Sequence, residues 1–420
     1  MQPSVPPPTL LPVEIWLACC TLCSRRQLRR LSLVCRLFRS LALPILVQYQ
    51  TIDVASLAIR MTMDNWRDRL RQLQRTAVRL DKLSQLPYTL LVRSWSVTFN
   101  QRGRWYLLGV ENMQPFDTLN ERVVSTLSAT LRLYQNLFSL QLTHVTVDGS
   151  LRETLSLLPR LEDLGLCNWE IVVPDGFLPL KCLILCAPGP TDTKEPLQIG
   201  CPGSLRTLHA GNYLSRFITG FGARILPQLV DLSLGTVQDV GLFFQFLGLC
   251  PRLESLAVRV LSNRAALPEV HATTIPHLRT LAGQPKLHHL LTSGRPISTE
   301  VLPGTSFGLA THEELVNVCF AITRSSAPVH SLKLVPKEAT NLELLAAITA
   351  LFPELRKLSL TLPEATDAPF LNVCYGRRPI PPVELEWPDL DDDTAFDNTP
   401  ADDLRRRDRR EPYNRGGEGR

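Results

Sequence analysis

The chain reads PQLVDLSL at residues 227–234 and PRLESLAV at residues 251–258, 24 residues further on. In both stretches three apolar residues follow a proline in the order P-x-L-x-x-L-x-[LV]. The last two apolar residues are two positions apart, so in an extended chain their side chains point to the same face. The proline stands just before them, where a helix has ended and no ladder hydrogen bond is needed. Each stretch therefore predicts a short β-strand with one buried face.

Less regular copies of this unit run along most of the chain. Most of them are 24 to 26 residues apart, and a longer step of 51 residues between 278 and 329 leaves room for one more unit near Thr299 to Leu302. Helices are expected between the strands, for example at 241–249, 313–323 and 342–352. One strand and one helix cannot bury their own leucines, so we expect the units to stack into a curved solenoid of α/β class. The first apolar residues of the units are Leu137, Leu161, Leu180, Leu205, Leu229, Leu253, Leu278, Val329 and Leu355.

The N-terminal stretch from Leu10 to Leu46, LLPVEIWLACCTLCSRRQLRRLSLVCRLFRSLALPIL, predicts three compact helical pieces. Pro12 and Glu14 suit a first helical turn, and Ser24 suits the N-cap of the next helix. Pro44 is expected to discourage continuation of the last helix. A unit this small needs another surface to cover its apolar stripe. The stripe consists of Leu28, Leu31, Val34, Cys35, Phe38 and Leu41.

The remaining divisions follow from composition and period. Residues 1–9 predict a disordered proline-rich leader, and 10–50 are the small helical domain. Residues 51–90 predict a helical connector, and 91–376 the repeat domain, which opens with a strand at 93–99 and a helix at 120–133. Residues 377–420 carry prolines, an acidic run and a basic run, and predict a disordered tail. The basic run is either a solvated segment or a nuclear-import signal.

Charge and cysteine content limit the function. A net charge of +5 from 45 basic and 40 acidic residues does not argue for nucleic acid. The 11 cysteines fit reduced thiols in an intracellular compartment, cytoplasmic or nuclear. Neither Cys20-x-x-Cys23 nor Cys182-x-x-x-Cys186 has the further ligands that a structural zinc site needs. No secretory signal or membrane-spanning stretch is recognised, so no membrane partner is expected.

Catalytic motifs fail on inspection. His312-Glu313 begins like the metalloprotease pattern H-E-x-x-H, but Val316 stands where the second His is required. Gly220-x-Gly222 begins like a dinucleotide-binding turn, but Ile225 replaces the third glycine. We therefore expect no enzyme activity, no cofactor and no metal.

The order Leu11-Pro12-x-Glu14-Ile15, followed by Leu28-x-x-Leu31-x-x-Val34-Cys35-Arg36-x-Phe38, resembles an F-box. The later units resemble leucine-rich repeats, although they lack the Asn or Cys that usually follows the strand. Together they resemble fungal-type F-box substrate receptors with degenerate leucine-rich repeats. The resemblance implies that the F-box docks on a Skp-type adaptor of a cullin–RING ubiquitin ligase and that the repeats recruit a target protein. The expected adaptor-binding residues are Leu11, Pro12, Ile15, Leu28, Leu31, Val34 and Phe38.

The repeats should present their polar side chains on the face opposite the leucines, which solenoids commonly use for binding. The candidate target-binding residues there are Gln141, His209, Ser233, Arg259, Lys333 and Lys357.

Two alternatives stay open. The arginines at 25, 26, 29, 30, 36 and 39 either form a solvated helix face or steer the chain toward an acidic adaptor. The chain is also compatible with a protein-interaction scaffold that has no role in ubiquitin transfer and whose N-terminal helices only cap the solenoid.

Overall fold

The computed structural model describes residues 11–53, 66–85, 89–98, 114–172, 176–188, 196–262, 270–302, 312–334 and 342–360. All of these belong to one compact unit, Met1–Asp367. The expected leader at 1–9 and the expected tail at 377–420, with its basic run, lie outside the described residues. None of the described helices is both long enough and apolar enough to cross a membrane.

The N-terminal stretch forms the three expected helices, α1 (Val13–Leu22), α2 (Arg25–Ser32) and α3 (Arg36–Gln48). Ser24 caps α2 as expected. Its hydroxyl accepts from the Gln27 backbone N–H, and the Gln27 side chain accepts from the Ser24 backbone N–H. The Arg25 guanidinium donates to the Leu46 and Tyr49 carbonyls at the end of α3. This arginine therefore ties α2 to the last turn of α3 instead of extending freely into solvent.

One expectation about this unit is wrong, namely that Pro44 discourages continuation of the third helix. Pro44 does not end α3, which runs on to Gln48 with the proline inside it. Proline removes one helical N–H donor, but the apolar side chains on either side of it hold the helix in place. Leu41 and Ala42 are buried, and Ile45 and Leu46 pack against the same cluster.

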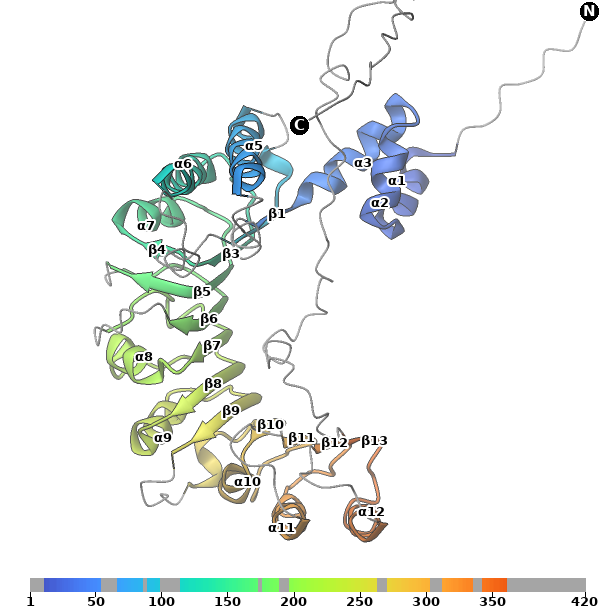
Figure 1. Ribbon diagram of the computed structural model, residues 1–420. Helices are drawn as coiled ribbons and strands as arrows, with labels where there is room; N and C mark the ends of the chain where they lie inside the picture. The colour runs from blue at the N-terminus through green and yellow to red at the C-terminus, as the bar shows by residue number, and fades with distance from the viewer. Residues whose placement is uncertain are drawn as a thin grey trace, which may run out of the picture. The chain divides into compact units, whose positions relative to one another are not determined.

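The rest of the described chain builds one parallel sheet with helices along it (Figure 1). The strands pair in the order β1-β2-β3-β5-β6-β7-β8-β9-β10-β11-β12-β13, and β4 pairs beside β5. This confirms the α/β class and the alternation of short parallel strands with helices. The strands are β1 (Tyr49–Asp53), β2 (Ser94–Thr98), β3 (Ser139–Thr143), β4 (Thr146–Val147), β5 (Asp163–Ile171), β6 (Cys182–Pro188), β7 (Thr207–Gly211), β8 (Asp231–Val237), β9 (Ser255–Leu261), β10 (Thr280–Gly283), β11 (Thr299–Leu302), β12 (Ser331–Leu334) and β13 (Lys357–Leu360).

The helices lie along one side of this sheet (Figure 1). The expected helices at 241–249, 313–323 and 342–352 are confirmed to within a residue by α9, α11 and α12. The helix expected at 120–133 begins six residues earlier, at Gln114. The helices are α5 (Trp66–Gln85), α6 (Gln114–Leu131), α7 (Gly149–Ser156), α8 (Leu214–Phe221), α9 (Val240–Gly248), α10 (Pro285–Leu291), α11 (His312–Ile322) and α12 (Leu342–Leu351), with short 3-10 turns η1 (Thr89–Leu91) and η3 (Ala272–Thr274).

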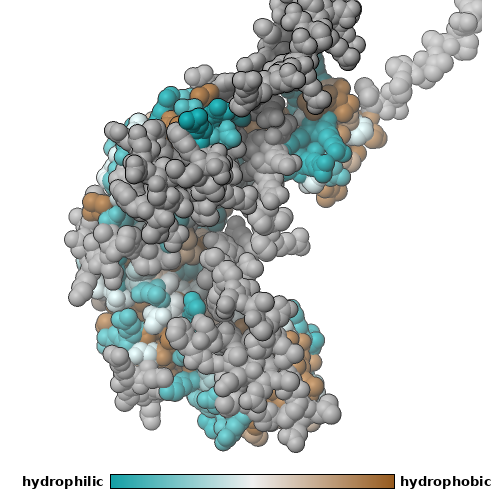
Figure 2. All heavy atoms as spheres, in the orientation of Figure 1, coloured by the Kyte–Doolittle hydropathy of each residue, from teal (hydrophilic) through white to brown (hydrophobic). Residues whose placement is uncertain are grey.

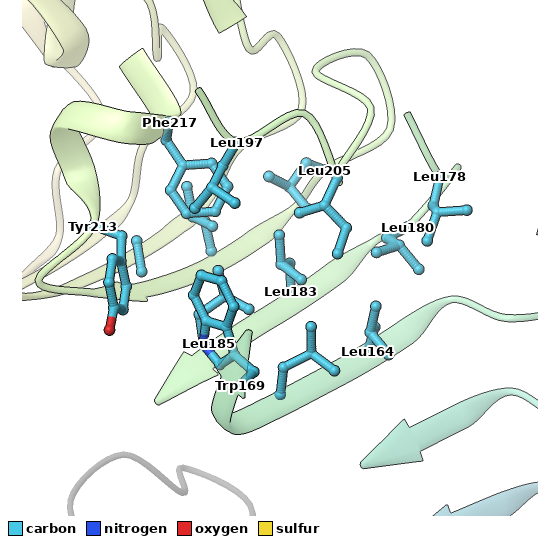
Figure 3. Packing of buried hydrophobic residues seen from close by; sticks show 14 of the residues in the cluster. Leu164, Trp169, Leu178, Leu180, Leu183, Leu185, Leu197, Leu205, Tyr213 and Phe217 are labelled. Carbon is cyan, nitrogen blue, oxygen red and sulfur yellow. The ribbon is translucent and has the colours of Figure 1, made fainter. Parts of the chain in front are cut away.

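The register explains why the repeat pattern works. The first apolar residue of each unit stands two positions before its strand, as Leu229 does before β8 and Leu253 before β9. The next leucine pairs across strands, so that Leu208, Leu232 and Leu256 lie side by side. Figure 3 shows the same packing around β5 and β6. We call this row the leucine ladder: Leu140, Leu164, Leu183, Leu208, Leu232, Leu256, Leu281, Leu332 and Leu358, with Trp95 at its start and Glu300 between Leu281 and Leu332.

Two expected strands outside the clear copies of the repeat are confirmed, and one strand was not expected. The strand expected at 93–99 is β2. The gap before Val329 does contain a unit, β11, at the expected position. The sheet also begins earlier than expected, because Tyr49–Asp53 is a strand and not the start of a helical connector. Val47 and Val92 stand two residues before β1 and β2, as the leucines do in later units. These valines are 45 positions apart, so they lack the spacing of the later repeats.

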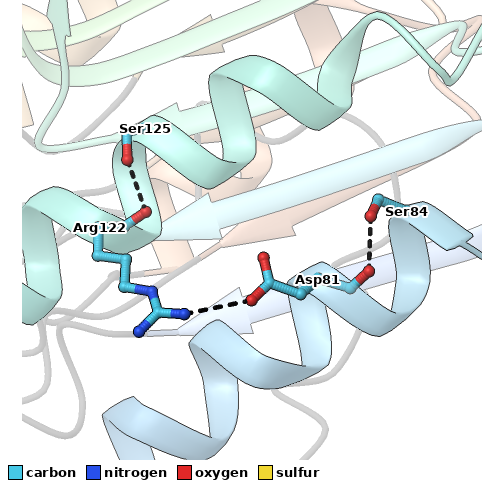
Figure 4. Close-up of polar contacts among 4 residues, drawn as sticks. All are labelled: Asp81, Ser84, Arg122 and Ser125. Atoms are coloured by element: carbon cyan, nitrogen blue, oxygen red, sulfur yellow. Dashed lines mark hydrogen bonds and ion pairs between the residues drawn. The ribbon is translucent and has the colours of Figure 1, made fainter.

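The helices α5 and α6 pack through apolar residues such as Leu73, Leu80 and Leu127, all of them buried. Asp81 and Arg122 bridge the two helices at 3.5 Å (Figure 4). Both side chains are largely exposed, so this ion pair contributes at most about 1 kcal/mol and the apolar contact dominates.

Gly220 and Gly222 have structural roles in α8. A Cβ atom on Gly220 would lie 2.1 Å from the Leu197 carbonyl oxygen, so only glycine lets α8 approach that segment. Gly222 ends α8 at a φ of +61°, and its N–H donates to the Ile218 carbonyl at 2.8 Å. The Gly-x-Gly pair is thus explained by helix packing and helix termination.

We predict that Gly220→Ala lowers the free energy of unfolding by at least about 1–3 kcal/mol, because the added methyl overpacks against backbone. Gly248→Ala in α9 is the matched control. Its Cβ would meet nothing within 4 Å, so the helix propensity of alanine should leave stability equal or up to about 1 kcal/mol higher. Urea denaturation of the full chain followed by circular dichroism measures both, and equal effects of the two substitutions would contradict the prediction.

Glu300 is a charged residue in the leucine ladder. Its side chain and that of His288 on α10 are fully buried, and His288 Nδ1 lies 2.5 Å from Glu300 Oε2. The two side chains are therefore in close polar contact inside the core. The other ring nitrogen of His288 lies 3.1 Å from the Gly283 carbonyl. The pair sits between the larger apolar cluster, which ends at Ile297, and a second cluster that begins at Leu302.

We predict that His288→Leu lowers the free energy of unfolding by about 1–3 kcal/mol, because it leaves the buried Glu300 carboxyl group without its polar partner. The double variant His288→Leu with Glu300→Leu should recover most of this loss, since leucine already occupies the neighbouring ladder positions. Urea denaturation of the parent, the single variant and the double variant tests this. A double variant no more stable than the single one would show that the lost His288–Glu300 contact does not account for the lower stability of His288→Leu.

Candidate functional site

The first helix leaves most of its apolar side chains in solvent. Within α1 only Cys20 is buried, while Ile15 is 48% exposed and Leu22 is 89% exposed. Val13 and Leu17 are also exposed, and Figure 2 shows hydrophobic side chains at the surface of the N-terminal helices. Exposed apolar surface of this kind is typical of sites that bind another molecule, so this helix is a candidate binding surface.

The turn between α2 and α3 adds to this surface. Leu33 and Val34 are 85% and 68% exposed there, and Leu37 in the first turn of α3 is also exposed. We call the exposed apolar side chains of this unit the N-terminal apolar surface: Leu11, Val13, Ile15, Leu17, Leu22, Leu33, Val34 and Leu37.

The seven expected adaptor-binding residues divide into two groups. Leu11, Ile15 and Val34 belong to the N-terminal apolar surface, and Pro12 is exposed at the N-cap of α1. The other three pack inside the unit.

Leu28 is 2% exposed and lies in the core with Cys20 and Leu41. Leu31 packs against this core, and Phe38 stacks edge-on against Trp16 at 5.1 Å. These three residues make contacts within the helical unit, where Leu31 and Phe38 are only partly buried, and direct contact with an adaptor stays a prediction for all seven.

The candidate target-binding residues lie on the face of the sheet opposite the leucine ladder, which we call the polar face. Their strands alternate buried and less buried residues, which places these six opposite the leucines. Gln141, His209, Ser233 and Lys333 share one row across the sheet. Arg259 and Lys357 lie in other rows of the same face.

The six residues do not form one compact site. His209 and Ser233 are direct neighbours on β7 and β8. Gln141 lies three strands from His209, or about 14 Å at the usual strand spacing of about 4.8 Å. Lys333 lies four strands from Ser233, or about 19 Å. A partner that touched all of them would have to span most of the sheet.

Local contacts show how two of these side chains are placed. The Gln141 side chain lies over Gly165 on the next strand, where a Cβ atom would be 3.1 Å from Gln141 Cγ. His209 Nε2 lies 3.8 Å from Asp231 Oδ2 on β8, and the carboxylate is well exposed. This distance is at the limit of an ion pair, so the contact adds little to stability.

Two side-chain amides accept hydrogen bonds from backbone N–H groups at the ends of strands. The Asn212 side-chain oxygen accepts from the Thr236 backbone N–H at 2.6 Å, and the Gln284 side-chain oxygen accepts from the Leu261 N–H at 3.1 Å. These amides satisfy backbone donors where strands β8 and β9 end. The sequence pattern missed them because neither stands at the position where the family carries its Asn.

The cysteines near the N-terminus behave as packed side chains. The Cys23 thiol donates to the Cys19 carbonyl at 3.3 Å. Burial, followed by the nearby thiols of Cys23 and Cys19, raises the pKa of Cys20. Among the residues that the structure describes, no three His, Cys, Asp or Glu side chains are placed to hold a metal ion.

Comparisons with known proteins add little beyond the fold. No protein-family model and no curated protein matches the chain. Among solved structures it is similar to a leucine-rich-repeat protein of Leptospira interrogans, with 14% identity over 66% of this chain and 81% of that chain and a TM-score of 0.23. The register of the strands described above, and not this distant similarity, defines the chain as leucine-rich-repeat-like.

We predict that Leu17→Ala hardly changes the stability of the N-terminal helices, whereas Leu28→Ala lowers it strongly. Leu17 is exposed, so its loss should change stability by no more than about 0.5 kcal/mol. Leu28 is core, so its loss should cost about 2–5 kcal/mol. Hydrogen–deuterium exchange of the α1–α3 amides in the full chain measures both. Faster exchange after Leu17→Ala, or unchanged exchange after Leu28→Ala, would contradict the assignment of surface and core.

Proposed function

We propose that the chain is a substrate-receptor subunit of a Skp–cullin–F-box ubiquitin ligase. In this proposal the N-terminal apolar surface docks on a Skp-type adaptor, and the polar face of the repeats recruits a target protein. The chain carries out no chemistry itself. It raises the local concentration of the target beside the transferring subunits, which is a contribution of proximity.

The observation that carries the proposal is the exposed apolar surface on helices that also carry the F-box-like order of residues. Residues 11–48 form three short helices with a small core, and eight of their leucine, isoleucine and valine side chains are exposed. Leaving such a surface in water is unfavourable by roughly 25 cal/mol per Å². A partner that covers it supplies the missing apolar contact.

A repeat scaffold without any ubiquitin role is the second candidate. It is favoured by the direct passage of α3 into β1, and by the Arg93 N–H, which donates to the Gln48 carbonyl at 2.9 Å. These contacts suit helices that cap the first repeat. A cap, however, needs a polar outer face, and α1 exposes apolar side chains instead. This difference makes the adaptor-docking proposal the stronger of the two.

The decisive experiment is a pull-down of a purified Skp-type adaptor by the full chain. We expect the parent to bind. The double variant Ile15→Asp with Val34→Asp should lose at least about thirtyfold in affinity, the equivalent of one strong interface residue at about 2 kcal/mol. Both residues are exposed, so the substitutions should leave the helices folded.

Ile225→Asp is the matched control, because Ile225 is an exposed isoleucine in the repeat domain, 60% accessible to solvent. It should bind the adaptor as the parent does. Failure of the parent to bind, or equal binding by the parent and the double variant, would overturn the proposal and leave the scaffold as the remaining candidate.

A further inference from the structure

Two cysteines face each other on the polar face of the sheet. Cys167 on β5 and Cys186 on β6 are direct partners in the parallel register. Each alternates with buried leucines along its strand, so both side chains point away from the leucine ladder. Both are partly accessible to solvent. The sequence analysis noted Cys186 only together with Cys182, four residues earlier on the same strand, and did not connect it with Cys167.

The backbone geometry permits a bond between them. Neighbouring strands lie about 4.8 Å apart, which places the two Cα atoms within the range of about 4.4–6.8 Å that disulfides adopt. Directly after Cys167 the strand becomes irregular, because Asn168 has a φ of +49°.

The local chemistry favours the thiolate at Cys167. The pKa of Cys167 is lowered to about 7, mainly by a hydrogen bond with the Cys186 side chain and to a smaller extent by a backbone hydrogen bond at Asn168, against the opposing effect of burial. By contrast, burial raises the pKa of Cys250 and of Cys319 to about 12 and about 11. A partly accessible thiolate next to a second thiol is the arrangement that peroxide-sensitive cysteines share.

We propose that Cys167 and Cys186 form an oxidative modification site on the polar face, at which a hydroperoxide converts the two thiols into a cross-strand disulfide. The Cys167 thiolate attacks one oxygen of the peroxide, the O–O bond breaks, and the departing hydroxide takes a proton to become water. Cys167 is then a sulfenic acid. The Cys186 sulfur attacks this sulfur, the S–O bond breaks, and the leaving hydroxide takes the Cys186 proton as a second water. The peroxide is reduced and the two thiols are oxidised.

This site does not depend on the proposed adaptor or target. It does lie on the face proposed for target binding, in the row that also contains Thr143 of β3. Oxidation would replace two hydrogen-bonding thiols on that face by one apolar bridge, and a thiol reductant would reverse the change.

The test treats the reduced full-length chain with hydrogen peroxide at pH 7, blocks the remaining thiols with N-ethylmaleimide and maps the products by peptide mass spectrometry. We expect a 167–186 disulfide that disappears on reduction with dithiothreitol. At pH 7 a thiol of pKa about 7 is about half ionised, but its lower nucleophilicity offsets much of this gain. We therefore expect Cys167 to react about threefold faster than an ordinary exposed thiol. Its rate should rise through pH 7.

Three serine variants separate the steps. Cys186→Ser should leave Cys167 as a sulfenic acid that dimedone captures, and Cys167→Ser should abolish the disulfide. Cys182→Ser is the matched control on the same strand. Cys182 pairs with Asp163 and not with Cys167, so this variant should form the 167–186 disulfide as the parent does. Persistence of both thiols in the oxidised parent, or a disulfide from Cys167 to another cysteine, would overturn the proposal.

Discussion

Strands of this protein pair in parallel with their leucines in register, and every other part of the described fold depends on that pairing. A single unit offers one short strand and one helix, and its leucines are buried only when the next unit covers them. The contact between Leu232 and Leu256 is representative, since each leucine is fully buried by neighbours from adjoining strands. A leucine buried in this way contributes about 1.5–3 kcal/mol, so the stacking of units outweighs exposed ion pairs such as Asp81–Arg122.

Some residues of the described chain depart from this pattern of leucines buried in register. Glu300 enters the leucine ladder and is tolerated because His288 meets it at 2.5 Å. The first helix departs in the other direction, since its apolar side chains are left in solvent where the repeats bury theirs. The polar contact of Glu300 lies within the chain, whereas the exposed side chains of α1 are the basis of the proposed docking to an adaptor. The third departure lies on the polar face, where Cys167 and Cys186 are direct partners on neighbouring strands. Their side chains do not fill the core.

The pattern of leucines was enough to predict the α/β class, the later strands and the helices between them. It missed the first strand, Tyr49–Asp53, because Val47 stands outside the repeat spacing, whereas the second strand was predicted from the alternation of polar and apolar residues at 93–99. It expected Pro44 to end a helix that in fact continues, because local preference was outweighed by packing on both sides of the proline. It identified the adaptor candidates as one set, although Leu28 is core and Ile15 is surface. Periodicity marks apolar residues but does not say which of them a small unit can cover.

By itself, the sequence determined that short strands recur about every 25 residues and that their leucines share one face, because both follow from spacing along an extended chain. Only the tertiary structure decided which residues become neighbours across strands. The pairing of Cys167 with Cys186, the placement of Glu300 between Leu281 and Leu332, and the exposure of α1 all depend on the register between segments far apart in the chain. The hydrophobic pattern fixes which face of a strand is buried, but which residues of two strands become partners is decided only when the strands pair.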